Sequence, residues 1–205
     1  RAGEMGTIAN ALVARFPEMA SFGYEEREPG LCHRLDVGTS GVLIAARSED
    51  AFKRITSAIR GGKIDKRYLL LCRDEGLPET GRIDQPVAPH LRSRRRMMVC
   101  NPAEARRRGA LPATTTYRVR ERKGSIALVE ARVPAAKRHQ IRVHFAAIQH
   151  PLLGDTLYGG ETIEGLSRHA LHASAISWKG DQVIPPFVVT APLPADMAAL
   201  LSPAR

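Results

Sequence analysis

Apolar residues recur with helical spacing in four stretches of the chain, namely residues 7–16, 48–60, 139–150 and, more briefly, 197–201. Thr7 and Ser48 are suited to cap the first two stretches, because a hydroxyl side chain accepts hydrogen bonds from the free amides of a helix's first turn. Pro17 and Pro151 follow or close the first and third stretches, and proline cannot continue a helix. The spacing therefore predicts four helices, the last of them short.

Five other stretches have the length and apolar content of strands, namely residues 42–46, 66–73, 114–120, 126–133 and 170–178. Lys123 and Gly124 supply a turn between the third and fourth of these, which predicts a hairpin. Residues 76–111 follow neither period and are expected to be irregular. Because strands outnumber helices and are often adjacent in sequence, the pattern favours an α+β fold over a doubly wound parallel sheet.

The composition adds a strong positive charge, since 31 Lys and Arg against 21 Asp and Glu give a formal net charge of +10. Such an excess attracts polyanions, of which nucleic acid is the commonest, although a basic surface can also serve solubility alone. No apolar run is long enough to cross a membrane. Cys32, Cys72 and Cys100 are few and widely spaced, which is typical of a reduced cytoplasmic protein.

Residues 33–41 place an acid beside a cation, ahead of two hydroxyls and an apolar strand. A cation such as Arg34 favours the ionised form that a carboxylate nucleophile or base requires, so Asp36 is a candidate for chemistry. The plain alternative is that Asp36 caps a turn through Thr39 or Ser40. Cys32 lies next to this segment but has no second thiol nearby in sequence, which favours a packed side chain over a nucleophile.

Four motifs, in one order along the chain, resemble the signatures of RluA-type RNA pseudouridine synthases of the RluA/RsuA superfamily. They are His33-Arg34-Leu35-Asp36 with Thr39-Ser40-Gly41, Lys66-Arg67-Tyr68, His139-Gln140-Ile141-Arg142-Val143-His144 with His150-Pro151, Gly154-Asp155 and Tyr158-Gly159, and Arg168-His169-Ala170-Leu171-His172. His33 ahead of Arg34-Leu35-Asp36 favours the RluA type over the RsuA type. Four motifs in order make a chance match very improbable.

The resemblance implies the pseudouridine synthase catalytic fold, a mixed and mostly antiparallel sheet with flanking helices and a central active-site cleft. It also implies three catalytic residues. Asp36 attacks the target nucleoside, Tyr68 stacks on the uracil, and Arg142 pairs with Asp36 as a planar, bidentate cation. No metal and no organic cofactor is expected.

The resemblance further implies a set of substrate contacts. Arg34 is expected to fill the space vacated by a uridine flipped out of the RNA, and a cation there offsets part of the cost of flipping. The other expected contacts are His33, Thr39, Leu171 and the arginine cluster Arg94, Arg95 and Arg96. Exposed arginines commonly bind phosphates, although such a cluster can also be a solvated loop face.

The likeness extends from about Thr7 to Pro192. Members of the family carry an upstream strand pair that this sequence does not contain, so we expect one catalytic domain, residues 1–205, shortened at its N-terminus relative to the family. Ala136-Lys137-Arg138 also departs from the G-R-T that often precedes the third motif. Family members commonly act as monomers, and a monomer is expected here.

The leading hypothesis is an isomerase that converts specific uridines of ribosomal or transfer RNA to pseudouridine through an aspartate nucleophile. The alternative from another class is a non-catalytic RNA-binding protein that retains the fold. Binding alone would not require Asp36, Tyr68 and Arg142 together, which argues against that reading. A glycosylase with an aspartate nucleophile is a third hypothesis, and it would release the base from the RNA.

Overall fold

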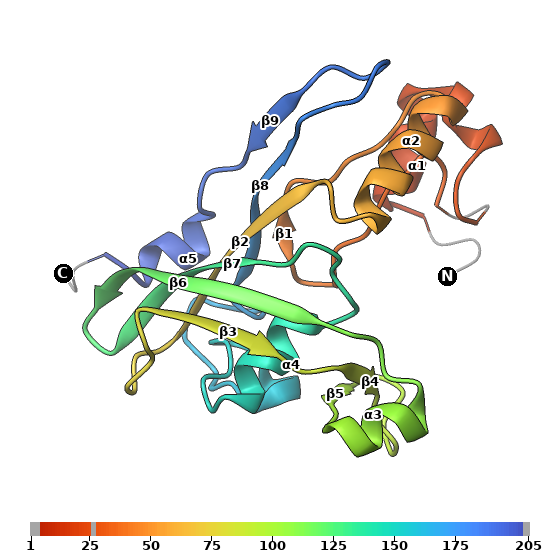
Figure 1. Ribbon diagram of the computed structural model, residues 1–205. Coiled ribbons are helices and arrows are strands. Elements are labelled where there is room, and N and C mark those ends of the chain that lie inside the picture. The colour runs from red at the N-terminus through yellow and green to blue at the C-terminus, as the bar shows by residue number, and fades with distance from the viewer. Residues whose placement is uncertain (1–4, 26–27, 203–205) are drawn as a thin grey trace.

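A computed structural model describes residues 5–25 and 28–202 and contains five α-helices and nine strands within them (Figure 1). The helices are α1 (Ile8–Arg15), α2 (Glu49–Arg60), α3 (Pro102–Arg108), α4 (Gln140–Ala147) and α5 (Ala195–Ala199), with short 3-10 turns η1 (Pro17–Ser21) and η2 (Thr156–Tyr158). The strands are β1 (Ser40–Gly41), β2 (Asp65–Arg73), β3 (Thr80–Asp84), β4 (Val87–Pro89), β5 (Met97–Val99), β6 (Thr114–Lys123), β7 (Ile126–Arg132), β8 (Leu171–Trp178) and β9 (Phe187–Thr190). The predicted α+β class is confirmed. None of these helices is long and apolar enough to span a membrane.

Seven of the strands form one sheet, six of them in the order β1-β8-β2-β7-β6-β3. The seventh, β9, pairs with residues 175–178 of β8, whereas β1 pairs with residues 172–173. Every pairing in this sheet is antiparallel except β1 with β8, so the sheet is mixed and mostly antiparallel, as predicted. The predicted hairpin is β6–β7, which turns at Gly124 with a positive φ of 56°. Strands β4 and β5 form a separate two-stranded hairpin.

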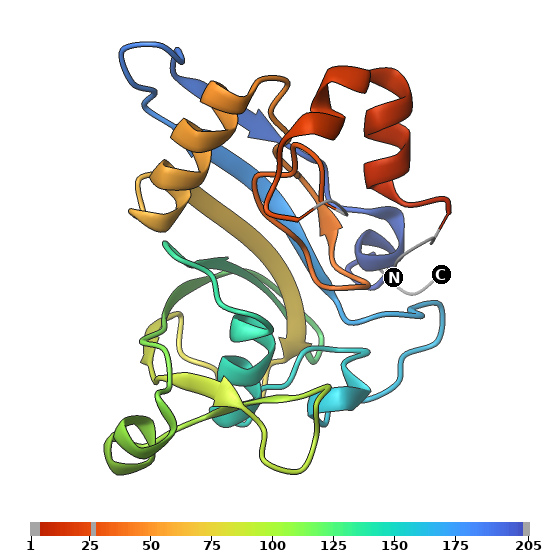
Figure 2. The same ribbon diagram turned by 90° about the vertical axis from the view of Figure 1, so that its right-hand side faces the viewer.

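A register irregularity places two helices on one face of the sheet. Between β2 and β8, Arg67 pairs with Ala175 while Tyr68 pairs with Ala173, which leaves Ser174 unpaired as a bulge. The extra residue lets Leu171 and Ala173 share a face with Ile176, although their sequence parity differs. Helix α4 packs at one end of this face and α2 at the other (Figure 2). A hollow lined by Asp36, Tyr68, Arg142 and Leu171 opens on this face beside α4.

The opposite face of the sheet is covered by the C-terminal part of the chain. Leu71 points away from the face that carries Tyr68 and Leu70 and packs with Met197 of α5. Helix α5 lies on that side in both ribbon views. The central strands β2 and β8 are therefore covered on one face by α2 and α4 and on the other by α5.

The structure corrects two expectations about strands and loops. Residues 42–46 do not form a sheet strand, because Gly41 at a φ of 117° turns the chain off β8 and β9 takes the vacated edge. The segment instead lies along residues 30–32, with Ala45 bridged to Leu31. Residues 76–111 are not irregular, since β3, β4, β5 and α3 lie there. These elements are too short to show a period, although Asn101, Pro102 and Glu104 carry a readable capping box.

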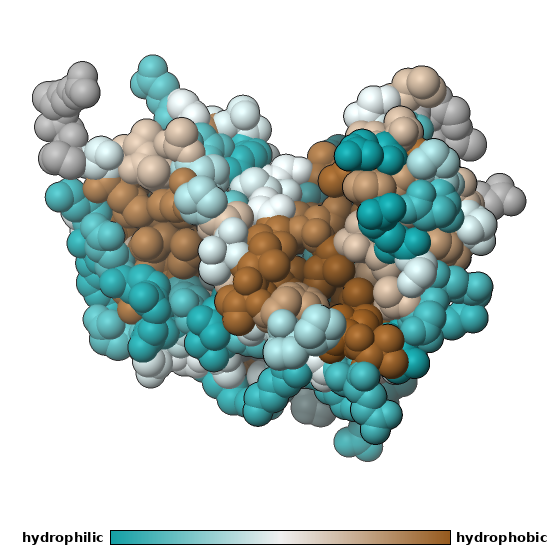
Figure 3. Space-filling view, turned by 90° about the horizontal axis from the view of Figure 1, so that it is seen from above, coloured by the Kyte–Doolittle hydropathy of each residue, from teal (hydrophilic) through white to brown (hydrophobic). Residues whose placement is uncertain are grey.

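An apolar groove lies on the side of the molecule where the β8–β9 ribbon and α2 project (Figure 3). It is lined by Val42, Leu43, Ile44, Ala45, Ile176, Phe187 and Val189. Figure 3 shows apolar side chains gathered in a hollow between more polar flanks. The groove follows from the path of residues 42–46, which run beside β8 and β9 without hydrogen-bonding to β9.

Gly41 allows a close backbone approach between β1 and β8. A Cβ there would lie 2.2 Å from the carbonyl oxygen of Ala173, and the φ of 117° already disfavours any other residue. Gly76 has a φ of 78° but nothing within 4 Å of its Cβ position. A substitution at Gly41 would therefore cause both backbone strain and a steric clash, whereas one at Gly76 would cause backbone strain alone.

We predict that Gly41→Ala lowers the free energy of unfolding by about 3–5 kcal/mol, the sum of a strained φ and a forced backbone shift. Gly76→Ala should cost only the conformational part, about 1–2 kcal/mol. Urea denaturation of both variants measures the difference. Equal losses would show that the β1–β8 contact has room for a methyl group.

Candidate active site

Asp36 lies in a tight loop between residue 32 and β1. The loop turns through a hydrogen bond from the Thr39 amide to the Asp36 carbonyl (2.9 Å), and Gly38 follows with a φ of 91°. Leu35 packs on the core below it. The carboxylate side chain of Asp36 keeps 19% of its surface exposed, so it is anchored by its neighbours and still accessible from the hollow.

Arg168 fastens this loop to the rest of the protein. Its Nη1 donates to the carbonyl oxygens of Gly38 (3.0 Å) and Leu171 (3.1 Å), and its other nitrogens bind Asp196 of α5 at 2.8 and 2.9 Å. The guanidinium lowers the pKa of the Asp196 carboxyl. One arginine thus joins the Asp36 loop, β8 and the C-terminal helix.

The floor of the hollow comes from the two central strands. Tyr68 of β2 is 7% exposed and Leu171 of β8 is 4% exposed, and both belong to the main core cluster. Burial, and secondarily the charge of Asp36, raises the pKa of Tyr68 to about 12. The phenol therefore keeps its proton at neutral pH and presents a flat, largely apolar surface.

Arg142 of α4 faces Asp36 across the hollow. Its Nη1 lies 3.6 Å from Oδ2 of Asp36, so the expected ion pair is present. Its bidentate partner, however, is Asp155, which accepts hydrogen bonds from Nε at 2.7 Å and Nη2 at 2.8 Å. The expectation that Arg142 binds Asp36 through both arms is wrong, because Asp155 occupies that geometry and leaves one nitrogen for Asp36.

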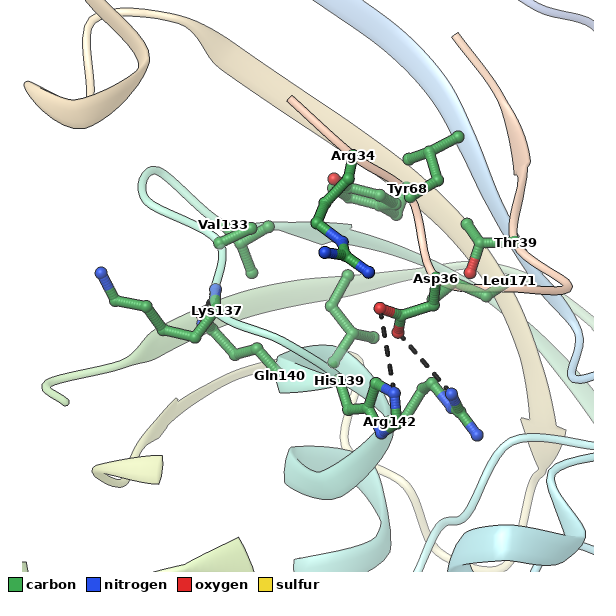
Figure 4. Close-up of a pocket in the computed structure, with 13 residues that line it drawn as sticks. Arg34, Asp36, Thr39, Tyr68, Val133, Lys137, His139, Gln140, Arg142 and Leu171 are labelled. Carbon is green, nitrogen blue, oxygen red and sulfur yellow. Dashed lines mark hydrogen bonds and ion pairs between the residues drawn. The ribbon is translucent and has the colours of Figure 1, made fainter. Parts of the chain in front are cut away.

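Asp36, Tyr68, Leu171 and Arg142 line one open pocket (Figure 4). Asp36 projects toward the pocket from one wall, and His139 and Arg142 approach its carboxylate from α4 (Figure 4). A wider, more polar cleft adjoins this pocket and shares Arg34, Asp36, His139 and Arg142 with it.

The other expected substrate contacts are placed differently from one another. Arg34 lines both cavities, has a side chain 81% exposed and makes one long ion pair with Glu28 at 3.8 Å. Thr39 lines the pocket and shares a 2.8 Å hydrogen bond with Nε2 of His169. Leu171 lines the pocket as expected.

His33 does not line the pocket. Its Nε2 accepts the Ile44 amide hydrogen at 3.0 Å, and burial lowers its pKa to about 4. The imidazole is therefore a neutral acceptor that joins the Asp36 loop to residues 42–46. The expectation of a substrate contact is corrected to a supporting role, since the ring already spends its acceptor on the backbone.

The arginine cluster 94–96 lies beside the wider cleft, on the loop that joins β4 to β5. Arg95 lines this cleft together with Arg138, and Arg138 donates to the carbonyls of Arg94 (3.2 Å) and Arg95 (3.1 Å). Arg94 is exposed but does not line the cleft. Arg96 lies over the ring of Tyr158 at 5.6 Å. Of the three arginines, only Arg95 lines the cleft.

Asp155, Tyr158, Arg168 and His169 are among the residues of the site that received no role from the sequence. Each of these residues lies inside one of the four motifs, but the sequence does not reveal which residues they contact. Gly154 and Gly160 show why Asp155 is placed so firmly: a Cβ at either would lie within 2.1 Å of a backbone oxygen. Within residues 5–25 and 28–202, no group of three His, Cys, Asp or Glu side chains suits a metal ion.

Comparison with known proteins identifies the family to which this fold and site belong. The family described as RNA pseudouridylate synthase matches residues 12–147. The solved structure of human RNA pseudouridylate synthase domain containing 1 superimposes with a TM-score of 0.73 at 25% identity, over 97% of this chain and 79% of that one. The chain therefore belongs to the RNA pseudouridylate synthase family, and the predicted RluA-type resemblance is confirmed.

Individual relatives are similar over nearly the whole chain. An uncharacterized RNA pseudouridine synthase of Chloroflexus aurantiacus is 36% identical over 96% of this chain. Ribosomal large subunit pseudouridine synthase D of Vibrio parahaemolyticus is 32% identical over 98% of it. The matched regions make up 59% and 62% of those two proteins, so this chain spans about three fifths of their length.

The Arg142–Asp155 pair predicts a large stability effect. The two side chains are 7% and 1% exposed, so Asp155→Asn leaves a buried guanidinium without its counter-charge. We expect the free energy of unfolding to fall by about 3–5 kcal/mol. Asp84→Asn removes a carboxylate from an ion pair with Arg82 in which both side chains are 61% exposed, and it should change stability little. Chemical denaturation of both variants tests this, and similar small losses would contradict a buried pair.

Proposed function

We propose that the chain is an RNA pseudouridine synthase in which Asp36 is the nucleophile. The observation that carries the proposal is an accessible carboxylate, that of Asp36, which faces the buried guanidinium of Arg142 at 3.6 Å in a pocket that the buried Tyr68 also lines. A carboxylate so held can attack, while a flat ring beside it can support a nucleobase. Family membership supports the same reading.

The reaction is an exchange of one glycosidic bond for another. Asp36 attacks the flipped uridine, and the bond between N1 of uracil and C1′ of ribose breaks. The uracil reorients in the pocket, a bond forms between its C5 and C1′, the bond between Asp36 and the nucleoside breaks, the proton on C5 leaves, and N1 takes up a proton. The chain's share is to hold the carboxylate, the ring and the detached base together, because a free base would otherwise be lost to solvent.

Each wall of the pocket supports one part of this sequence. Tyr68 and Leu171 offer an apolar surface over which a planar base can turn without breaking hydrogen bonds. Arg142 stabilises the negative charge of Asp36 before attack and after release. Arg34, exposed at the mouth, is the residue best placed to enter the stack that the uridine leaves.

Ribosomal RNA is the proposed substrate class. Three of the relatives that match this chain at 32% identity over 98% of its length are named ribosomal large subunit pseudouridine synthase D. The net charge of +10 and the arginines along the wider cleft suit an RNA backbone. A substrate of this kind would place the reaction in the cytoplasm.

The direct experiment is tritium release from RNA that carries 5-tritiated uridine, because formation of the carbon–carbon bond expels that hydrogen. The parent protein should release tritium, and Asp36→Asn should release none above background while it still binds RNA. Asp50→Asn, on the exposed surface of α2, is the matched control and should act like the parent. Full release by Asp36→Asn would remove Asp36 as nucleophile, and RNA binding without release by the parent would favour a non-catalytic binding protein.

Tyr68 provides a second prediction about the same site. If the aromatic ring of Tyr68 is its main contribution to activity, Tyr68→Phe should keep kcat/KM within about tenfold of the parent. Tyr68→Leu removes aromatic stacking worth about 1–3 kcal/mol and should lower kcat/KM by about 10- to 100-fold. Thermal unfolding of each variant separates a folding defect from a catalytic one. Equal losses in Phe and Leu would assign the effect to the hydroxyl.

A further inference from the structure

His139 and Tyr158 form a hydrogen-bonded pair beside Asp36. Nδ1 of His139 lies 2.8 Å from the oxygen of Tyr158, and Nε2, on the other side of the ring, lies 4.0 Å from Oδ1 of Asp36. His139 is the N-cap of α4 and has a φ of 53°, a left-handed conformation, and it lines the pocket. The imidazole therefore lies between the phenol and the carboxylate.

The proton count at Tyr158 fixes the proton on His139. The Tyr158 oxygen accepts the amide hydrogen of Met97 at 2.7 Å, so its own single proton needs an acceptor elsewhere. Tyr158 is 6% exposed, and the other hydrogen bond of this oxygen in the described part of the chain is to Nδ1 of His139. A proton on Nδ1 would leave the buried phenol without an acceptor, which costs about 1–3 kcal/mol. Nδ1 is therefore the acceptor.

Burial, more than the surrounding charges, keeps the imidazole neutral. Burial lowers the pKa of His139, Arg142 and Arg138 lower it further, and Asp36 and Asp155 oppose them. Burial also raises the pKa of Tyr158, so the phenol keeps its proton at neutral pH. A neutral imidazole with a bare Nδ1 must carry its proton on Nε2, and that is the nitrogen that faces Asp36.

We propose that Tyr158 is a positioning residue that holds His139 as the Nε2–H tautomer, and that His139 thereby presents a neutral N–H donor to the carboxylate of Asp36 and to a uracil bound against it. A neutral N–H can donate a hydrogen bond to an oxygen of Asp36 both when the carboxylate is charged and when its charge has been lost during the reaction. A carbonyl oxygen of the bound uracil can accept the same hydrogen. The contact of 4.0 Å is long in the free protein, and hydrogen bonds at such sites shorten when substrate binds.

Tyr158 also links this donor to the arginine-bearing hairpin. The amide that it accepts belongs to β5, the guanidinium of Arg96 lies 5.6 Å above its ring and that of Arg142 lies 5.1 Å from the ring. If bound RNA displaced β5, the Tyr158 hydroxyl would transmit the movement to His139, because it is hydrogen-bonded to both Met97 and His139. The kinetic part of this inference rests on the proposed function, whereas the tautomer can be measured without RNA.

The test is a long-range proton–nitrogen NMR spectrum of the protein labelled with ¹⁵N-histidine, in which bare and protonated ring nitrogens resonate far apart. The His139 signals are assigned by their absence in His139→Gln. The parent should show a bare Nδ1 and a protonated Nε2. Tyr158→Phe should lose this pure tautomer, while Tyr117→Phe, which removes a hydroxyl from a buried tyrosine of β6, should leave the spectrum unchanged. A proton on Nδ1 in the parent, or an unchanged spectrum in Tyr158→Phe, would overturn the proposal.

Two substitutions of His139 carry the test to catalysis. The amide nitrogen of Gln reaches about as far as Nε2, whereas that of Asn reaches only as far as Nδ1. Asn tolerates the left-handed backbone better than Gln does, so backbone strain cannot explain a poorer Asn variant. We expect His139→Gln to keep kcat within about tenfold and His139→Asn to lose about a further tenfold, with KM little changed in both. Equal kcat values for Gln and Asn would contradict a donor at the Nε2 position, and inactivity of the parent would instead refute the proposed function.

Discussion

The buried pair between Arg142 and Asp155 is the constraint on which the site depends. Two hydrogen bonds of 2.7 and 2.8 Å hold the guanidinium in one plane, and they leave Nη1 pointing at Asp36 from 3.6 Å. A lone arginine at this depth would carry an uncompensated charge, while a lone Asp36 would have no fixed partner. Asp155 therefore fixes the guanidinium that faces the carboxylate of Asp36 without itself touching Asp36, and Gly154 and Gly160 fit Asp155 into its place.

The rest of the fold brings these groups from distant parts of the chain to one point. The bulge at Ser174 puts α2 and α4 on one face of the sheet and leaves the middle of β2 and β8 open between them. Gly41 turns residues 42–46 away from β8, and Arg168 ties the Asp36 loop to the C-terminal helix. Rigid strands thus form the floor of the pocket, and short, tethered loops hold the reactive groups at its edge.

Much of this could be predicted from the sequence, and the failures share a physical cause. The α+β class, the β6–β7 hairpin and the main helices followed from periodicity, and Asp36, Tyr68 and Arg142 followed from motifs that the structure brings to one pocket. Periodicity could not reveal three-residue strands or a chain turned by one glycine. Motifs could not say which acid takes both arms of Arg142 or that His33 spends its acceptor on a backbone amide, because partners are set by three-dimensional packing.

Nucleoside analysis of RNA after incubation with the protein tests the central claim most directly. The RNA is digested to nucleosides, and pseudouridine, uridine and free uracil are quantified by liquid chromatography and mass spectrometry. An isomerase that keeps the base between Tyr68 and Asp36 predicts a gain of pseudouridine equal to the loss of uridine, with no free uracil. Free uracil with abasic RNA would contradict the account in favour of a glycosylase, and an unchanged nucleoside composition with intact RNA binding would contradict it in favour of a binding protein.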